Sequence, residues 1–271
     1  MRAGRVHSVI AAGLEDPRLL ARWRHEPELL RGCGVDPAAL DLEALWKFAG
    51  LSAKVKHNGL RADLPLTFRL MNVAGLEIEV FASYAAARAD DGRRYAETPA
   101  ARAADLSDFL KDWLDFGRRE HAMLWDVLRY EMALARLRRA AAAEAETETQ
   151  GPRSAVAPNG KSVPGVRGEV ILHEMRCDPR AVAETLWEKT PRLGDVPLGA
   201  HYFCFWRRGA GTEVHILQLD ELGFYLLSLA DGRRTAARIS RALGGGARPA
   251  KGFLAALGEL AEFGILTFDA S

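Results

Sequence analysis

The sequence predicts an α+β protein with a helical domain at residues 1–142 and a smaller mixed domain at residues 166–271. Apolar residues recur at helical spacing in the first part, whereas β-rich runs and short helical stretches fill the second. Between them, residues 143–165 contain three prolines, no aromatic residue and no hydrophobic period, so we predict a flexible linker there. With 271 residues, 48% of them hydrophobic, the chain can form a substantial core.

The clearest helix of the first domain lies in "RREHAMLWDVLRYEMALARLRRA". Its apolar side chains repeat at spacings of four and three residues: Met123, Val127, Tyr130, Leu134 and Leu137. Another helix is predicted to begin at Asp36–Pro37, because aspartate can cap a first turn in which proline is tolerated. A third is predicted over residues 101–116. Residues 75–92 start with strand-like alternation, but the alanines that follow favour a helix.

The mixed domain begins with "GEVILHEMRCDPRAVAETLWEK", which predicts a strand and then a helix that starts at Asp178–Pro179. The runs "HYFCFWRR" and "TEVHILQL" are β-rich and joined by "GAG", which predicts a β-hairpin. Three helical stretches follow, at residues 224–229, 239–243 and 253–266. A hairpin that leads into three short helices is the plan of a small winged-helix-like domain.

Composition and charge argue against several classes of protein. The 37 basic and 36 acidic residues leave a formal net charge of +1, without the basic excess usual in nucleic-acid-binding domains, so we expect no nucleic-acid partner. No stretch approaches the roughly 20 apolar residues that a membrane-spanning helix needs. We therefore expect no membrane partner. His7 and Ser8 interrupt the short apolar stretch near the start, which argues against a signal peptide. Three widely separated cysteines without a C-x-x-C pair favour the reducing cytoplasm.

The sequence also lacks the motifs of a self-contained metal site. None of the seven histidines lies in H-E-x-x-H or in an E-x-x-H pair, so we expect no metal and no cofactor in this chain. A catalytic site built on Glu120, His121 or Cys33 remains an alternative. Against it, Glu120 and His121 point in different directions on a helix, and "GCGVDP" looks like a packed turn between helices.

Two neighbouring features of the mixed domain predict a site for an extended peptide. An outer strand over Thr212–Leu219 would leave backbone N–H and C=O groups available to one more strand. The last helix carries an apolar stripe of Phe253, Leu257 and Leu260 with Leu254 beside it, which suits an apolar groove and equally suits a core.

The phrases "LDELGFYLLSLADGRRTAARISRAL" and "FLAALGELAEFGILTF" carry a family resemblance. The first contains a helix that ends at Asp231–Gly232 and another that starts at Thr235, and the second closes on Gly264–Ile265–Leu266. Together they resemble the precursor-peptide recognition element of peptide natural-product pathways, a fold similar to the small chaperone of pyrroloquinoline quinone biosynthesis.

The wider layout resembles the partner subunits of multinuclear non-haem iron peptide-modifying oxidases, as in methanobactin and thiaglutamate biosynthesis. That layout is a helical half with "LRYEMALARL", a linker, the strand and helix of "VILHEMRCDPRAVAETL", and then the recognition element. The resemblance implies an accessory subunit that is not catalytic by itself. By the same resemblance, this subunit would pair as a heterodimer with a barrel-shaped subunit that holds the iron and modifies a cysteine of a ribosomally made precursor peptide.

The same resemblance implies where the leader of the precursor peptide binds. It would lie along one strand and pack on the last helix, in contact with Glu213, Val214, His215, Ile216, Leu217, Phe253, Leu254 and Leu257. The helical domain would contact the iron subunit, for which Trp113, Trp125 and Tyr130 are candidate contact residues unless they belong to the core.

An alternative of another class is a winged-helix transcription regulator that binds DNA. In that case Arg233, Arg234 and Arg238 would contact phosphates, and binding to duplex DNA would depend steeply on salt. Against this alternative, the last helix offers mostly Ala, Leu, Gly and Phe, whereas recognition helices usually carry several polar side chains for base edges.

Overall fold

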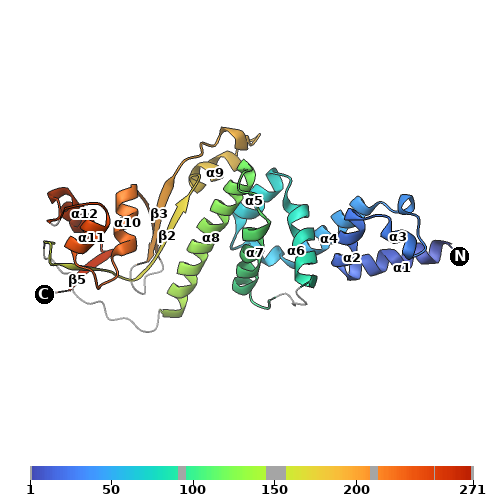
Figure 1. Cartoon of the computed structure of the whole chain (residues 1–271), viewed down its shortest axis with the longest axis horizontal. Helices are drawn as coiled ribbons and strands as arrows, with labels where there is room; N and C mark the ends of the chain where they lie inside the picture. Colours follow the sequence, from blue (N-terminus) through green and yellow to red (C-terminus); the bar gives the residue numbers. More distant parts are fainter. Residues whose placement is uncertain (1, 91–95, 145–156, 208–212, 247, 270–271) are drawn as a thin grey trace. The chain divides into compact units, whose positions relative to one another are not determined.

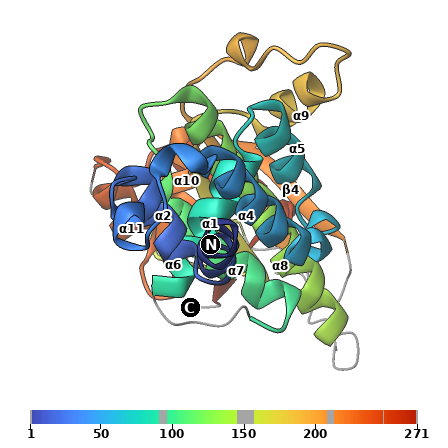
Figure 2. The same ribbon diagram turned by 90° about the vertical axis from the view of Figure 1, so that its right-hand side faces the viewer.

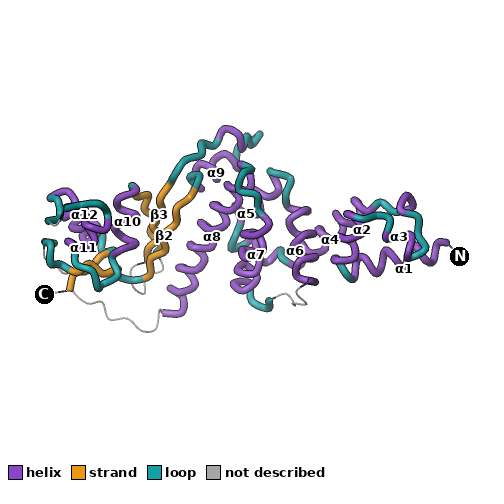
Figure 3. Tube along the Cα trace, in the orientation of Figure 1, coloured by secondary structure: helices purple, strands orange, loops and turns teal. Residues whose placement is uncertain are grey.

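The computed structural model describes residues 2–90, 96–144, 157–207, 213–246 and 248–269. The predicted α+β class is confirmed. The chain divides into two compact units: Met1–Leu128 with Val182–Val196, and Arg129–Ala181 with Pro197–Ser271. Figure 3 shows that the described strands all belong to the second unit.

The first unit is helical. Its helices are α1 (Arg2–Glu15), α2 (Pro17–His25), α3 (Leu29–Gly32), α4 (Leu42–Lys56), α5 (Pro65–Val73), α6 (Glu77–Asp90), α7 (Pro99–Trp113) and the first part of α8 (Arg119–Glu144). Short 3-10 turns add η1 (Pro37–Ala39), η2 (Asn58–Arg61) and η3 (Leu193–Asp195). Figure 2 shows α1, α2, α4 and α6 beside one another, and α4 packs along α6.

The structure corrects one expectation for these helices and confirms another. Asp36 caps only η1, and α4 begins six residues later behind Asp41, whose carboxylate accepts a hydrogen bond from the Ala44 N–H at 2.9 Å. The predicted helix over residues 75–92 is α6. Its alternating start does not form a strand because Val80 and the residues after it pack against α4 as a buried helical face.

The described part of the second unit contains two small antiparallel sheets, a group of three helices and the last part of α8. One sheet has the strand order β2 (Glu169–Met175), β3 (His201–Arg207), β4 (Val214–Leu219), and the other pairs β1 (Val163–Val166) with β5 (Leu266–Asp269). The three helices are α10 (Glu221–Leu229), α11 (Ala236–Ala242) and α12 (Lys251–Glu262). Helix α9 (Pro179–Leu186) follows β2 and belongs to the first unit from Val182 on. The predicted hairpin is confirmed by β3 and β4.

The three-stranded sheet is covered on both faces within the second unit. Figure 1 shows α8 along one side of β2 and β3 and the group α10–α12 on the other. On the α8 side, Tyr130 and Leu137 pack with Phe203 and Phe205. On the opposite side, Cys204 and Trp206 pack into the core of the three helices. Because successive strand residues face opposite ways, β3 is buried on both faces.

The predicted linker and the predicted last helix both differ from the structure. Residues 145–156 of the predicted linker lie outside the described residues, and its last residues belong to strand β1, which spans Val163–Val166. The helix predicted over 253–266 ends at Glu262. Gly264 then adopts φ +84°, a left-handed conformation that reverses the chain into β5.

The compact units also divide at a different place from the predicted domains. The boundary falls between Leu128 and Arg129, inside α8, so the last part of this helix belongs with the sheet. Packing on Phe203 and Phe205 explains why the helix changes unit along its length.

Candidate functional site

Strand β4 forms one edge of the three-stranded sheet. It pairs with β3 from Tyr202–Leu219 to Arg207–Val214, and no other strand of the described chain pairs with its outer side. Thr212, the predicted first residue of this strand, lies outside the described residues. Alternate residues of an edge strand direct their backbone N–H and C=O groups away from the sheet, so β4 offers hydrogen-bonding groups to an added strand.

The side chains of β4 alternate between two apolar environments. Val214 and Ile216 pack beside Tyr130 on the α8 side of the sheet. Leu217 and Leu219 pack against the core of α10–α12 on the other side. These four residues are only partly buried, as expected for the outermost strand of a sheet. An extended peptide at this edge would therefore meet apolar surface on both sides.

The chain is more polar just before β4 and at its start. The side chain of Glu213 is 82% exposed, and its carboxylate lies 3.9 Å from Nδ1 of His215. The His215 ring lies over Trp206, with ring centroids 5.0 Å apart. The Trp206 indole N–H donates to the Arg167 carbonyl at 3.0 Å, which fixes the ring under the histidine.

A polar cluster lies on the α8 face of the sheet, near the end of β4. Arg180 donates hydrogen bonds to Asp178 at 2.8 Å and to Gln218 at 2.6 Å, and its guanidinium lies over the Phe203 ring. Burial alone would raise the pKa of Asp178, but the hydrogen bonds from Arg180 outweigh it and hold that pKa below its usual value. The carboxylate is therefore ionised near neutral pH.

The opposite edge of the sheet, β2, is different. Arg129 on α8 donates a hydrogen bond to the backbone carbonyl of Glu174 at 2.6 Å. Arg136, about two turns further along α8, pairs with Glu169 at 2.8 Å. Of these two contacts, the one from Arg129 occupies a backbone carbonyl of β2.

The three helix residues of the predicted site lie in the same apolar cluster as Leu217. Leu257 is fully buried and Phe253 is 8% exposed, so both belong to the core and offer almost no surface to a ligand. Leu254 is only partly buried and retains some accessible surface. The structure thus brings the predicted strand and helix residues together, but Phe253 and Leu257 lie in the core against which the strand packs.

An apolar patch beside the end of β4 was not anticipated from the sequence. Tyr202 pairs with Leu219 and lies 5.0 Å from Phe224, measured between ring centroids. Tyr225 and Leu222 on α10 are 39% and 47% exposed. The signal was present in "ELGFYLL", where apolar residues cover more of the helix than one face requires.

The arginines of the DNA-binding alternative lie on the surface of the loop before α11 and on α11 itself. The Asp231 carboxylate accepts hydrogen bonds from the backbone N–H groups of Arg233 and Arg234, which lower its pKa. Its side chain also pairs with Arg234 at 3.4 Å, which partly neutralises that cation. Arg238 is exposed on α11.

The candidate catalytic residues do not form a recognisable constellation. Nδ1 of His121 accepts a hydrogen bond from the Asp115 N–H at 3.0 Å, and burial lowers the pKa of this histidine. Cys33 is exposed after α3, and Glu120 is partly buried at the start of α8. Across the described ranges, no three His, Cys, Asp or Glu side chains are grouped so that they could hold a metal ion.

Of the candidate contact residues in α7 and α8, Tyr130 is 9% exposed and belongs to the core, whereas Trp113 and Trp125 are partly exposed.

Among the helices in the described part of the chain, none combines the length and the hydropathy needed to cross a membrane. No protein-family model matches the chain, and a search of curated proteins finds no match to it.

Proposed function

We propose that this chain is a non-catalytic partner protein that binds the leader of a ribosomally made precursor peptide and presents it to an iron-dependent oxidase. The oxidase modifies a cysteine of the peptide in natural-product biosynthesis, and its iron belongs to the partner subunit. In this proposal β2–β4 and α10–α12 form a winged-helix-like recognition element. The observation that carries the proposal is the open outer side of β4, with apolar side chains on both of its faces.

Recognition would follow from strand addition. The backbone of the leader would pair with β4, and its side chains would alternate between Ile216 on one face and Leu217 on the other. Backbone hydrogen bonds supply affinity for any extended chain, whereas the two apolar faces select leaders with apolar residues at successive positions. The exposed Tyr225 and Leu222 would extend this selection past the end of the strand.

The helical unit would contact the iron subunit. Three large apolar side chains on α4 support this part of the proposal, because Phe48, Leu51 and Val55 are 56%, 46% and 59% exposed. Their spacing of three and four residues places them on one face of the helix. An apolar helix face in water is typical of a surface that a partner covers.

The experiment that tests the proposal uses proline substitutions in β4. Of the neighbouring variants His215→Pro and Ile216→Pro, one removes an N–H that faces β3 and the other removes an N–H that faces outward. His215→Ala and Ile216→Ala are the matched controls, because they shorten the same side chains but keep the backbone N–H. Labelled synthetic peptides from the N-terminal segments of short reading frames beside the gene serve as the probe.

We expect one proline variant to retain the wild-type circular dichroism spectrum yet bind the peptide at least about tenfold more weakly than its alanine control. A folded proline variant that binds every peptide like the wild type would contradict the proposal. Co-purification with a neighbouring barrel-type iron protein tests the second half. Steeply salt-dependent binding of a labelled DNA duplex, with no peptide bound, would instead favour the transcription regulator.

A further inference from the structure

A cavity of about 410 Å³ lies between α6 and α7 in the first unit. It is lined by Tyr84, Ala87, Arg88, Asp105, Asp108, Phe109, Asp112 and Trp113. All of these residues belong to the same compact unit, and none is part of the β4 site.

Aromatic rings form one wall of this α6–α7 cavity. The Tyr84 and Phe109 ring centroids are 5.2 Å apart, and the Phe109 and Trp113 rings stack at 6.2 Å. Trp113 in turn stacks on His121 at 5.3 Å, with the ring planes 23° apart. Burial keeps the pKa of His121 low, so this neighbour is uncharged near neutral pH and does not oppose a cation on the Trp113 face.

Carboxylates form the second wall. Asp105, Asp108 and Asp112 are three and four residues apart on α7, which places them along one face of the helix. Asp105 pairs with Arg88 at 2.7 Å. Neither Asp108 nor Asp112 makes a side-chain hydrogen bond or ion pair with any residue the structure describes. Among the described residues that line the cavity, one guanidinium stands against three carboxylates, so these lining residues together carry a net negative charge.

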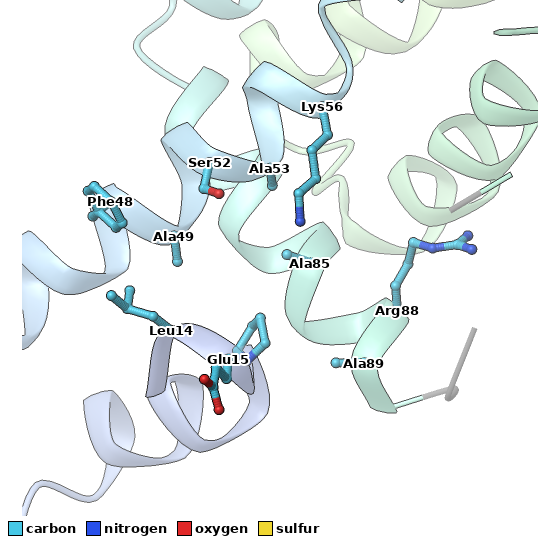
Figure 4. A pocket seen from close by; sticks show the side chains of 11 residues that line it. Leu14, Glu15, Phe48, Ala49, Ser52, Ala53, Lys56, Ala85, Arg88 and Ala89 are labelled. Carbon is cyan, nitrogen blue, oxygen red and sulfur yellow. The ribbon is translucent and has the colours of Figure 1, made fainter. Parts of the chain in front are cut away.

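Arg88 shows what kind of group these walls accommodate. Its guanidinium lies 5.7 Å from the centroid of the Tyr84 ring while it pairs with Asp105, and the residue is only 8% exposed. Arg88 also lines a second, smaller cavity of about 260 Å³ with α4 and the end of α1 (Figure 4). In that view its guanidinium extends away from Lys56 and from the alanines of the floor.

We propose that the α6–α7 cavity binds a second guanidinium group, supplied by a ligand, against the Trp113 and Phe109 faces with Asp108 and Asp112 as its counter-ions. Aromatic faces attract organic cations, tryptophan most strongly, and Arg is favoured over Lys because its planar group can stack and pair with a carboxylate at once. A hydrated metal ion would gain nothing from the aromatic wall. This site is independent of the peptide edge on β4 and of the function proposed for it.

The test follows the indole N–H signal of Trp113 by NMR in the full chain, assigned by its loss in Trp113→Phe. The probes are acetyl-arginine amide, which represents an arginine in a polypeptide, propylguanidine, which represents a small free guanidine of the same single charge, and acetyl-citrulline amide, which has a similar shape but no charge. The double variant Asp108→Asn/Asp112→Asn removes the proposed counter-ions. Glu259→Gln/Glu262→Gln, on the exposed side of α12, makes the same change in net charge elsewhere.

We expect a saturable shift with at least one guanidinium probe and none with the citrulline probe. The aspartate double variant should bind about tenfold more weakly, and the glutamate double variant should bind like the wild type. Tighter binding of acetyl-arginine amide than of propylguanidine assigns the site to a polypeptide side chain, and the reverse order assigns it to a small molecule. Equal shifts with citrulline, no saturable shift, or unchanged binding by a folded aspartate double variant would overturn the proposal.

Discussion

The rings of Tyr130 and Phe205 meet edge to face, with centroids 5.4 Å apart and planes 70° apart. Tyr130 lies on α8 and Phe205 on the central strand β3, and both belong to the second compact unit. The contact therefore joins the last part of a helix that the sequence pattern assigned to the N-terminal domain to the sheet that carries the candidate peptide edge. Ile216 of β4 packs in the same cluster, so α8 supports that edge directly.

Replacement of Tyr130 by alanine should destabilise the second unit by about 3 kcal/mol, because it removes a large side chain that is 9% exposed and its contact with Phe205. Urea unfolding followed by circular dichroism measures the loss. The control is Arg138→Ala on the exposed side of α8, which should change the free energy of unfolding by less than about 0.5 kcal/mol. Equal effects of the two substitutions would mean that α8 does not cover the sheet in solution.

The sequence pattern identified the elements whose signals are local. Hairpin β3–β4 was predicted because two β-rich runs flank a glycine turn, and α6 was predicted from its alanines. Strand β1 was missed because its partner β5 is about a hundred residues away, and a proline-rich stretch by itself reads as a linker. The sequence also could not predict that α8 passes from one unit to the other. Helical periodicity identifies an apolar face but does not identify the element that packs against it.

The candidate site was predictable only in part, for a similar reason. An outer strand follows from the hairpin and from its order in the chain, so β4 could be found. The apolar stripe of α12 could face either a ligand or the core, and burial of Leu257 decides for the core. The patch at Tyr202 and Tyr225 arises from two segments that meet only in the folded chain. The same is true of the α6–α7 cavity.

Acid should weaken the second unit through His173 on β2. Burial, with a smaller effect from Arg129, lowers the pKa of His173 from 6.5 to about 4. The unfolded chain takes up a proton below pH 6.5 and the folded chain does so only near pH 4, so the free energy of unfolding falls as the pH drops between these values. At pH 5 the loss from this residue is at most about 2 kcal/mol.

The measurement compares urea unfolding of the wild type and His173→Gln at pH 7.5 and pH 5. Burial also lowers the pKa values of His57 and His121 in the first unit, so both proteins should lose stability in acid. The variant should lose less, and the exposed control His25→Gln should behave like the wild type. An acid loss as large in His173→Gln as in the wild type would show that this histidine titrates normally in the folded chain.

Close packing of α4 on α6 should make Gly50 intolerant of any side chain. A Cβ atom at this position would clash with the backbone carbonyl oxygen of Ile78, which cannot rotate away as a side chain could. We expect Gly50→Ala to destabilise the first unit by about 2 kcal/mol or more, as measured by thermal unfolding. Gly32→Ala in α3, where a Cβ meets nothing within 4 Å, should be neutral or slightly stabilising. Similar melting temperatures for the two variants would contradict the close approach.

The three cysteines should differ sharply in reactivity, and one of them can report on β4. Cys33 is exposed, whereas Cys177 and Cys204 are fully buried, and burial raises the pKa of Cys204 to about 12. Iodoacetamide at pH 8 should therefore alkylate one site quickly in the native chain and three in urea, as counted by intact mass.

Cys204 pairs with Leu217 of β4, so its thiol becomes accessible only when the second unit opens. A peptide that adds a strand to β4 stabilises the closed unit and should slow alkylation of Cys204 by about a hundredfold when its free concentration is a hundred times its Kd. Alkylation of Cys33, in the other unit, should not change and serves as the internal control. A bound peptide that leaves the rate at Cys204 unaltered, under conditions in which opening limits alkylation, would have to bind somewhere other than β4.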